Sequence, residues 1–356
     1  MSSLFASVKA RVRDLRPYSL TPERARVKIN QNENPWDVAV KIKQEVLARA
    51  SVRAWSRYPD FIPAALHERL ALFAGWKPEG IIAGNGSNEL IQALMMVTVG
   101  ESVRVLISEP TFALYRQLAT ILGGEIISIP LTPEFEYDSR VLRNAIEASQ
   151  PLVTIICSPN NPTGSVMARD DIAALAEAAR GLIVIDEAYF EFAEQSAVPL
   201  LERYSNIVVL RTFSKAMAMA ALRVGYLLAA PELVREISKA VLPYNLNALS
   251  QSAAEIAVEK YETEIEPLVK KIIGERERLY SEISRIPGLD PVRSRGNFMI
   301  VRSEIPPRRV FDELLKRDIL IRDVSSYPML KEYFRVSVGT PAENDLLVAA
   351  LLEVFT

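Results

Sequence analysis

A lysine set among hydroxyl side chains and small residues is the strongest chemical signal in this sequence. Lys215 follows an apolar run and comes shortly after Thr212 and Ser214, and Arg223 lies eight positions later. A lysine amine can form a Schiff base with an aldehyde, while hydroxyls and an arginine fork can hold a phosphate. These are the attachments that pyridoxal phosphate (PLP) needs. The alternative is a surface lysine at the end of a strand.

A carboxylate and a tyrosine follow another apolar run, at residues 182–186. Asp186 could pair with the pyridine nitrogen of PLP and keep it protonated, which makes the ring an electron sink. Tyr189 could hydrogen-bond the 3′ oxygen of the ring. Considered alone, a carboxylate at a strand end is more often a helix cap.

Three more turns follow apolar runs. The turn at 84–89 places Ser87 and Asn88 at the start of a predicted helix, where backbone amides suit a phosphate. Phe112 could stack on the cofactor ring, although core packing would explain it equally well. Asn161 lies in the SPNNPTG segment at 158–164, a pattern that is ordinary turn chemistry in many proteins.

The elements that must position these side chains alternate along the chain. Apolar runs at 81–84, 104–108, 125–131, 153–158, 182–186, 207–210 and 225–229 read as strands without polar alternation, and helical patterns occur at 88–99, 112–122, 139–148 and 170–179. Such alternation predicts an α/β fold in which helices cover both faces of a mostly parallel, seven-stranded sheet. Ligands of such sheets bind at the carboxyl ends of the strands, where the candidate residues fall.

The pattern changes after Pro243. A charge-rich helical stretch at 250–285 precedes strands near 298–302, 319–323 and 334–338 and helices at 308–316 and 341–354, which indicates a smaller α+β domain. A chain of 356 residues is long enough for two domains. We predict a large PLP-binding domain at 46–245 and a small domain at 246–356. The irregular arm at 1–45 is expected to lie against the small domain and form part of it.

Composition excludes several classes of protein. A net charge of −2, from 42 basic and 44 acidic side chains, argues against nucleic acid as a partner. His67 and Cys157 are the only residues of their types, so neither a multi-histidine zinc site nor an intrachain disulfide can form, and we expect no metal. We expect Cys157 to be buried and His67 to lie on the surface. We recognise neither a signal peptide nor a membrane-spanning run, which favours the cytoplasm.

The candidate residues also occur in an informative order: phosphate turn, aromatic, asparagine, aspartate with tyrosine, then lysine with arginine. This order resembles the fold-type I PLP-dependent aminotransferases, and the Lys215 segment is similar to their class II signature. Within that superfamily, the whole chain looks most like the histidinol-phosphate aminotransferases. The marks are RPY at 16–18, KINQNENP at 28–35, RYPD at 57–60, PYNLN at 243–247, IRD at 321–323 and FRVSVGT at 334–340.

The resemblance implies roles for individual residues. Lys215, Asp186 and Tyr189 are the catalytic set that it implies. The other cofactor contacts are Ser87, Asn88, Asn161, Ser214 and Arg223, and Tyr58 is similar to a tyrosine that reaches the cofactor phosphate of the neighbouring subunit, which implies a homodimer. Arg335 matches an arginine that binds a substrate carboxylate, Tyr18 and Arg322 match positions near the substrate phosphate, and we expect Asn32 and Asn161 to contact substrate as well. Two positions depart from the family pattern: Ala221 stands where glycine is usual, and Phe112 stands where tyrosine is common.

The reaction that the resemblance implies is amino-group transfer between L-histidinol phosphate and 2-oxoglutarate, in histidine biosynthesis. An aromatic amino acid aminotransferase or a PLP-dependent decarboxylase of a phosphorylated amino acid could share every cofactor residue. A PLP-binding regulatory module is the non-enzymatic alternative, but the chain has no spare length or basic segment for a DNA-binding domain. For Arg322, an internal salt bridge to a carboxylate such as Asp323 is the alternative to substrate binding.

Overall fold

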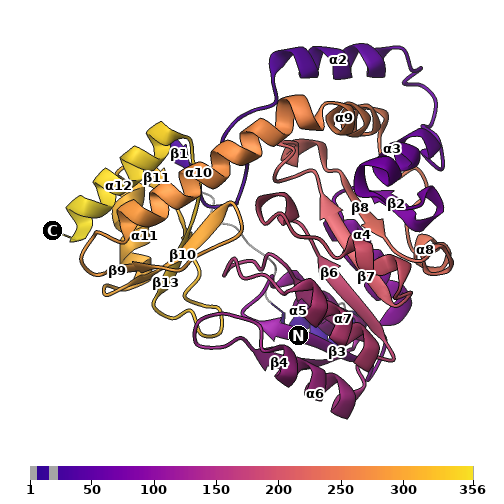
Figure 1. Ribbon diagram of the computed structural model, residues 1–356, viewed down its shortest axis with the longest axis horizontal. Coiled ribbons are helices and arrows are strands. Elements are labelled where there is room, and N and C mark those ends of the chain that lie inside the picture. Colours follow the sequence, from indigo (N-terminus) through magenta and orange to yellow (C-terminus); the bar gives the residue numbers. More distant parts are fainter. Residues whose placement is uncertain (1–5, 16–22, 356) are drawn as a thin grey trace.

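The computed structural model describes residues 6–15 and 23–355, whose strands form one large sheet and two smaller ones (Figure 1). The large sheet has seven strands in the order β2-β8-β7-β6-β5-β3-β4. They are β2 (Ile81–Gly84), β3 (Arg104–Glu109), β4 (Glu125–Pro130), β5 (Val153–Cys157), β6 (Leu182–Asp186), β7 (Ile207–Thr212) and β8 (Gly225–Leu228). Only β8 runs opposite in direction to the other six strands. The prediction of a mostly parallel seven-stranded sheet is therefore confirmed.

Helices cover both faces of this sheet, which explains why its strands are apolar on both sides. In β5, Ile155 packs into one buried core and Ile156 into another, because successive strand residues point to opposite faces. The covering helices include α3 (Ala64–Ala74), α4 (Ser87–Thr98), α5 (Leu114–Leu122), α6 (Ser139–Ser149), α7 (Arg169–Ala178) and α8 (Pro231–Ser238). The edge strand β4 differs from the expected pattern, because its residues are only partly buried or exposed.

A four-stranded antiparallel sheet forms the second body of the molecule, with the order β12-β13-β10-β9. Its strands are β9 (Leu289–Pro291), β10 (Phe298–Ser303), β12 (Arg322–Asp323) and β13 (Tyr333–Ser337), packed with α11 (Pro307–Lys316) and α12 (Pro341–Phe355). The prediction of one continuous strand at 319–323 is wrong. The chain changes partners there, because β11 (Ile319–Leu320) pairs with β1 (Val27–Lys28) and β12 pairs with β13.

The helical stretch predicted at 250–285 consists of two helices rather than one. Asn247 caps α9 (Ala248–Glu259) by accepting a hydrogen bond from the Ser250 amide at 2.9 Å. A π-helical turn at Tyr261–Ile265 follows, and then α10 (Glu266–Ile283) extends to the four-stranded sheet (Figure 1). Pro267, at the start of α10, has no amide hydrogen, so it favours a helix start at this point.

The N-terminal segment contacts both parts of the molecule. Short α1 (Ala10–Arg13) contacts α5, and Arg11 pairs with Glu101 at 2.6 Å, whereas β1 joins β11. Helix α2 (Val40–Ser51) packs on α9. The division into domains at residues 45 and 245 stays a prediction.

The two single-copy residues lie in different surroundings. Cys157 is buried, as predicted. His67 lies on α3 and is half-buried in the wall of a hollow rather than fully on the surface; its Nε2 has no partner among the described residues, and burial lowers its pKa to about 4. No helix in the described part of the chain is long and apolar enough to cross a membrane.

Candidate functional site

A cavity of about 500 Å³ lies at the carboxyl ends of the parallel strands and reaches the four-stranded sheet. Nearly all the residues singled out in the sequence line it. They are Asn32, Ser87, Asn88, Phe112, Asn161, Asp186, Tyr189, Thr212, Ser214, Lys215, Arg223, Arg322 and Arg335. Their convergence follows from topology, because parallel strands end at the same edge of a sheet.

One end of the cavity is a cradle for an anion at the N-terminus of α4. Gly86 precedes the helix with φ 83°, and a Cβ there would lie 2.5 Å from Arg223 Nη2. A Cβ on Gly225 would lie 2.3 Å from the Ser87 amide nitrogen. Arg223 Nη1 donates to Ser214 Oγ at 3.2 Å, and Thr212 Oγ1 donates to the same oxygen at 3.0 Å. Glycines thus let a guanidinium and two hydroxyls lie against the helix amides, an arrangement suited to phosphate.

A buried carboxylate lies deeper in the cavity. Asp186 is 3% exposed, and its oxygens accept from Tyr115 Oη at 2.6 Å and from the Ala188 amide at 3.0 Å. Burial raises the pKa of Asp186 to about 6 despite these two hydrogen bonds, which favour the charged form. Such a carboxylate is suited to a cationic partner inside the cavity.

The amine of Lys215 reaches the middle of the cavity. Nζ donates to the Gln31 carbonyl at 2.9 Å and lies 5.8 Å from the centroid of the Tyr189 ring. Burial, together with the nearby cations Arg335 and Arg223, lowers the pKa of Lys215 to about 7, against the opposing effect of Glu33. Much of this amine is therefore neutral, and hence nucleophilic or basic, near neutral pH.

Asn32 and Tyr189 form a hydrogen-bonded pair in the cavity wall. Asn32 Nδ2 donates to Tyr189 Oη at 3.0 Å, and Asn32 Oδ1 accepts from Ser337 Oγ at 3.0 Å. Asn32 is 1% exposed with φ 54°, a conformation that asparagine tolerates better than most residues. Because Asn32 donates to it, the tyrosine oxygen is left with its own hydrogen to donate.

Two arginines face each other across the four-stranded sheet. Arg322 of β12 is directly opposite Arg335 of β13, so both side chains are on the same face, and both line the cavity. Arg335 Nη1 donates to Asn161 Oδ1 at 2.5 Å, and its Nη2 donates to the Asn30 carbonyl at 2.8 Å. Arg322 forms no ion pair within the described residues, and Asp323 points to the other face of the strand. Like charges directly opposite repel, so an anion between them would stabilise this pair.

Among the described residues, one predicted site residue, Tyr58, does not line the cavity. Tyr18 lies outside the described residues. Tyr58 is 80% exposed and stacks on Tyr244 with a centroid distance of 4.5 Å. Further large apolar side chains are exposed close to it in the sequence, at Trp55, Phe61 and Ile62.

Sequence reasoning missed some residues of the cavity. Tyr115, which donates to Asp186, was not singled out, although it lies one helical turn after Phe112 and packs edge-to-face against it at 5.6 Å. Tyr327 and Val324 also line the cavity and follow Arg322 in the chain. Ala221 has no positive φ, so alanine is compatible with the backbone where glycine was expected.

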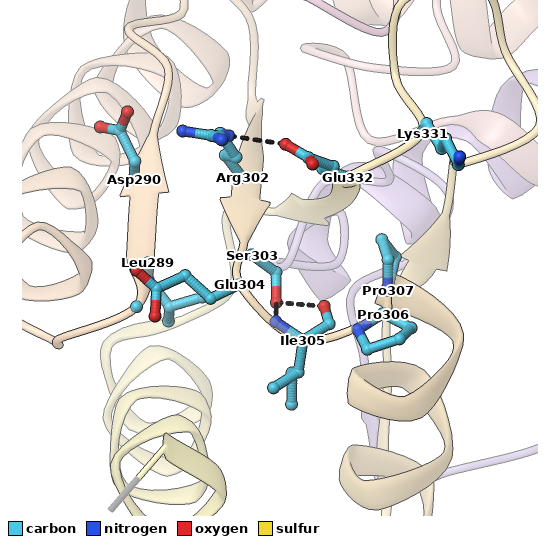
Figure 2. A pocket seen from close by; sticks show the side chains of 11 residues that line it. Leu289, Asp290, Arg302, Ser303, Glu304, Ile305, Pro306, Pro307, Lys331 and Glu332 are labelled. Atoms are coloured by element: carbon cyan, nitrogen blue, oxygen red, sulfur yellow. Dashed lines mark hydrogen bonds and ion pairs between the residues drawn. The ribbon is translucent and has the colours of Figure 1, made fainter.

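A separate hollow of about 350 Å³ lies on the four-stranded sheet and beside the start of α11 (Figure 2). Arg302 pairs with Glu332 at 2.8 Å in its wall, and Ser303 Oγ bonds the Ile305 carbonyl at 2.7 Å. None of the predicted site residues lines this hollow, and these polar groups are already paired. We therefore take the cavity around Lys215 as the candidate active site.

Comparisons with known proteins agree with this choice. The sequence pattern of the family described as aminotransferase class I and II matches residues 25–351. Histidinol-phosphate aminotransferases from Chlorobium phaeovibrioides and Chlorobaculum tepidum are each 37% identical, covering 96% and 92% of this chain and 95% and 94% of their own lengths. The crystal structure of histidinol-phosphate aminotransferase from Sinorhizobium meliloti in complex with pyridoxal-5′-phosphate superposes with a TM-score of 0.89, at 26% identity, over 99% of this chain and 98% of that one.

Proposed function

Because this chain belongs to the class I and II aminotransferases, and within them to the histidinol-phosphate aminotransferase family, we propose that it transfers an amino group between L-histidinol phosphate and 2-oxoglutarate in L-histidine biosynthesis, with PLP as cofactor. The observation that carries the proposal is the cross-strand pair Arg322–Arg335 in the cavity that holds Lys215. Histidinol phosphate carries a phosphate, and 2-oxoglutarate carries one carboxylate on the reacting carbon and a second one farther away; arginine forks suit phosphate and carboxylate alike.

The residues of the cavity fit PLP at both ends. The residues that would hold its phosphate are Ser87, Asn88, Ser214 and Arg223. A side chain at Gly86 or Gly225 would collide with Arg223 or with the Ser87 amide, so the two glycines keep this cradle open. Asp186 would hold the ring nitrogen, since it is a buried carboxylate without a cationic partner among the described residues. PLP, when bound, withdraws electrons from the carbon that bears the substrate amine. Phe112 lines the same space and would stack on the ring.

Lys215 is the group that moves the proton. With its pKa lowered to about 7 by burial and nearby cations, the Lys215 amine is available in its neutral, basic form near neutral pH. It can then accept the proton from the carbon that bears the amino group. Its hydrogen bond to the Gln31 carbonyl gives the amine an orientation before reaction.

Tyr189 and Asp186 orient the reacting group. Tyr189 is free to donate its hydroxyl hydrogen toward the cavity, since its oxygen accepts from Asn32. We propose that Asn32 acts mainly through this bond, because both ends of its amide are already paired. Tyr115 holds Asp186 Oδ2 at 2.6 Å and fixes the direction of the carboxylate.

Arg335 and Arg322 would divide the recognition of substrate. Arg335 is 8% exposed and is fixed by Asn161 and by the Asn30 carbonyl, which suits a carboxylate close to the reacting carbon. Arg322 is less buried and would bind the phosphate of histidinol phosphate or the distal carboxylate of 2-oxoglutarate.

We further propose a homodimer in the cytoplasm. Tyr58 is exposed beside Tyr244 and Phe61, and a hollow of about 590 Å³ with mainly apolar lining adjoins it, near exposed Leu242. Large apolar groups gathered in this way mark interaction surfaces. A second copy seated there would bring Tyr58 to the cofactor phosphate of its neighbour. The buried, unpaired Cys157 suits a reducing compartment.

A panel of amino donors tests the proposed substrate. We expect 2-oxoglutarate to be converted to glutamate much faster with histidinol phosphate than with phenylalanine or tyrosine. Faster turnover with the aromatic amino acids would replace the proposal with an aromatic aminotransferase. Release of carbon dioxide from a phosphorylated amino acid without any keto acid would instead indicate a decarboxylase.

A further inference from the structure

A buried ion pair lies at the same strand ends as the candidate site, on the opposite face of the large sheet. Glu187 follows Asp186 and Arg211 precedes Thr212, so strand alternation turns both away from the cavity. Their side chains are 2% and 4% exposed. Glu187 Oε2 accepts from Arg211 Nε and pairs with Nη2, each at 3.0 Å.

The pair also contacts the loop that follows β6 and the neighbouring strand β8. Glu187 Oε1 accepts from the Ala197 amide, and Glu187 Oε2 accepts from Ser196 Oγ at 3.0 Å. The Arg211 guanidinium lies 3.6 Å from the centroid of the Phe190 ring and donates to Tyr226 Oη at 3.4 Å. The ends of β6, β7 and β8 are thereby joined behind the cavity.

We propose that Glu187 and Arg211 are positioning residues for the aminotransferase reaction. Their ion pair fixes the turn that carries Asp186 and Tyr189 relative to the segment that carries Lys215. Two charges removed from water are no better for stability than a well-packed apolar pair, whereas the guanidinium fork of Arg211, with Nε and Nη2 both on Glu187 Oε2, fixes the direction of the contact. The inference rests on the proposed function only in requiring a PLP-dependent amino transfer, whatever the donor.

The other ionisable groups around the pair suggest how to perturb it without unfolding the protein. Glu191, Tyr226 and Tyr261 face Arg211 from the adjoining elements. Burial raises the pKa of Glu191 to about 8, so the Glu191 carboxyl is mostly protonated at neutral pH while the ion pair is intact. In Glu187→Gln, Glu191 can ionise and balance the charge of Arg211, although it lies outside the geometry of the original fork. Charge is then largely preserved while direction is lost.

The test uses the PLP-loaded full chain and compares Glu187→Gln and Arg211→Lys with a matched control. Glu275→Gln is the control, because Glu275 is a partly buried carboxylate, 17% exposed and bonded to Arg278 and Asn344, but it lies outside the cavity wall. Three quantities are measured well below the melting temperature: the affinity for PLP, the pH midpoint of the visible absorbance of bound PLP, and the rate of the half-reaction with glutamate.

We expect both variants at the pair to slow the half-reaction by about 10- to 100-fold, as small displacements of catalytic groups do. The pH midpoint of the absorbance should shift, because the Asp186 carboxylate would no longer be oriented toward the ring nitrogen. The affinity for PLP should stay close to that of the wild type. The control should lower the melting temperature and change neither rate nor midpoint.

The inference is overturned if a folded variant at the pair matches the control in both rate and absorbance midpoint. Should Glu187→Gln fail to fold, Arg211→Lys decides the question, since it keeps the charge and loses only the fork. A wild-type protein that shows no half-reaction with glutamate would refute the proposed function instead, and the absorbance midpoints would still test the pair.

Discussion

In the protein without cofactor, the amine of Lys215 should titrate near neutral pH. Its desolvation in the cavity, with Arg335 and Arg223 nearby, lowers the pKa from 10.5 to about 7. At pH 7 about half of these amines are then neutral, compared with roughly one in 3000 for a lysine with the ordinary value of 10.5. Reaction with an electrophile needs the neutral amine, so the pH profile of the reaction rate reports the lowered pKa of Lys215 directly.

Labelling of the cofactor-free protein with trinitrobenzenesulfonate, followed by peptide mapping, measures the rate at Lys215. We expect the rate to rise about tenfold per pH unit up to pH 7 and to level off by about pH 8. The same lysine in the denatured chain should continue to gain reactivity up to about pH 10. Arg335→Ala should move the midpoint upward, since it removes a cation.

A rate at folded Lys215 that still rises tenfold per unit between about pH 8 and 9.5 would refute the reasoning. Stability gives an independent check. A lysine whose folded pKa is lowered contributes stability that is present above pH 10.5 and is lost as the pH falls toward about 7, because the unfolded chain binds the proton first. The cofactor-free protein should therefore melt at a lower temperature at pH 7 than Lys215→Met.

Three other predictions follow from the site. Asp186→Asn should slow turnover by orders of magnitude, and unchanged turnover would contradict the role of Asp186 at the ring nitrogen. In calorimetry, the same change should stabilise the cofactor-free protein above pH 6 by up to about 3 kcal/mol, because a carboxyl with a raised pKa destabilises the folded state once the pH exceeds that pKa. Arg322→Ala should raise the KM for histidinol phosphate by about one to two decades, for a lost contact of roughly 1.5–3 kcal/mol, and barely affect an uncharged aromatic donor, so equal losses would contradict phosphate binding. Sedimentation should give a dimer, and a fully active monomer would exclude this arrangement. Mixing Tyr58→Ala with Lys215→Ala subunits should restore up to about a quarter of wild-type activity, since half of the dimers then hold one intact site out of two.

Much of the site could be predicted from the sequence, because each candidate follows an apolar strand. Asp186, Thr212 and the turn at Ser87 converge for that reason alone. Parallel strands bring their carboxyl ends to one edge, whichever strands are neighbours. The order of the strands was therefore not needed to gather the cofactor residues in one cavity.

The cross-strand pair of arginines could not be predicted in this way. Arg322 and Arg335 face each other because of the register between β12 and β13, which depends on pairing that a single sequence does not reveal. The chain also divides 319–323 between two sheets, and no residue type marks that change of partner. His67 likewise lines a hollow together with side chains from a distant part of the chain, such as Val241 and Leu242.

The pairing of β1 with β11 has a consequence for biosynthesis of the chain. Val27 is in register with Ile319, 292 positions later, and Ile29 donates through its amide to the Leu320 carbonyl at 3.0 Å. A segment that is made before its partner therefore remains without that strand until the 292 further residues up to Ile319 have left the ribosome. Contacts of such high sequence separation form late, since closing a long loop costs entropy before any contact offsets it. Nascent chains that stop before residue 319 should consequently leave the segment around Val27 open to proteases and chaperones, even if the large sheet has already formed.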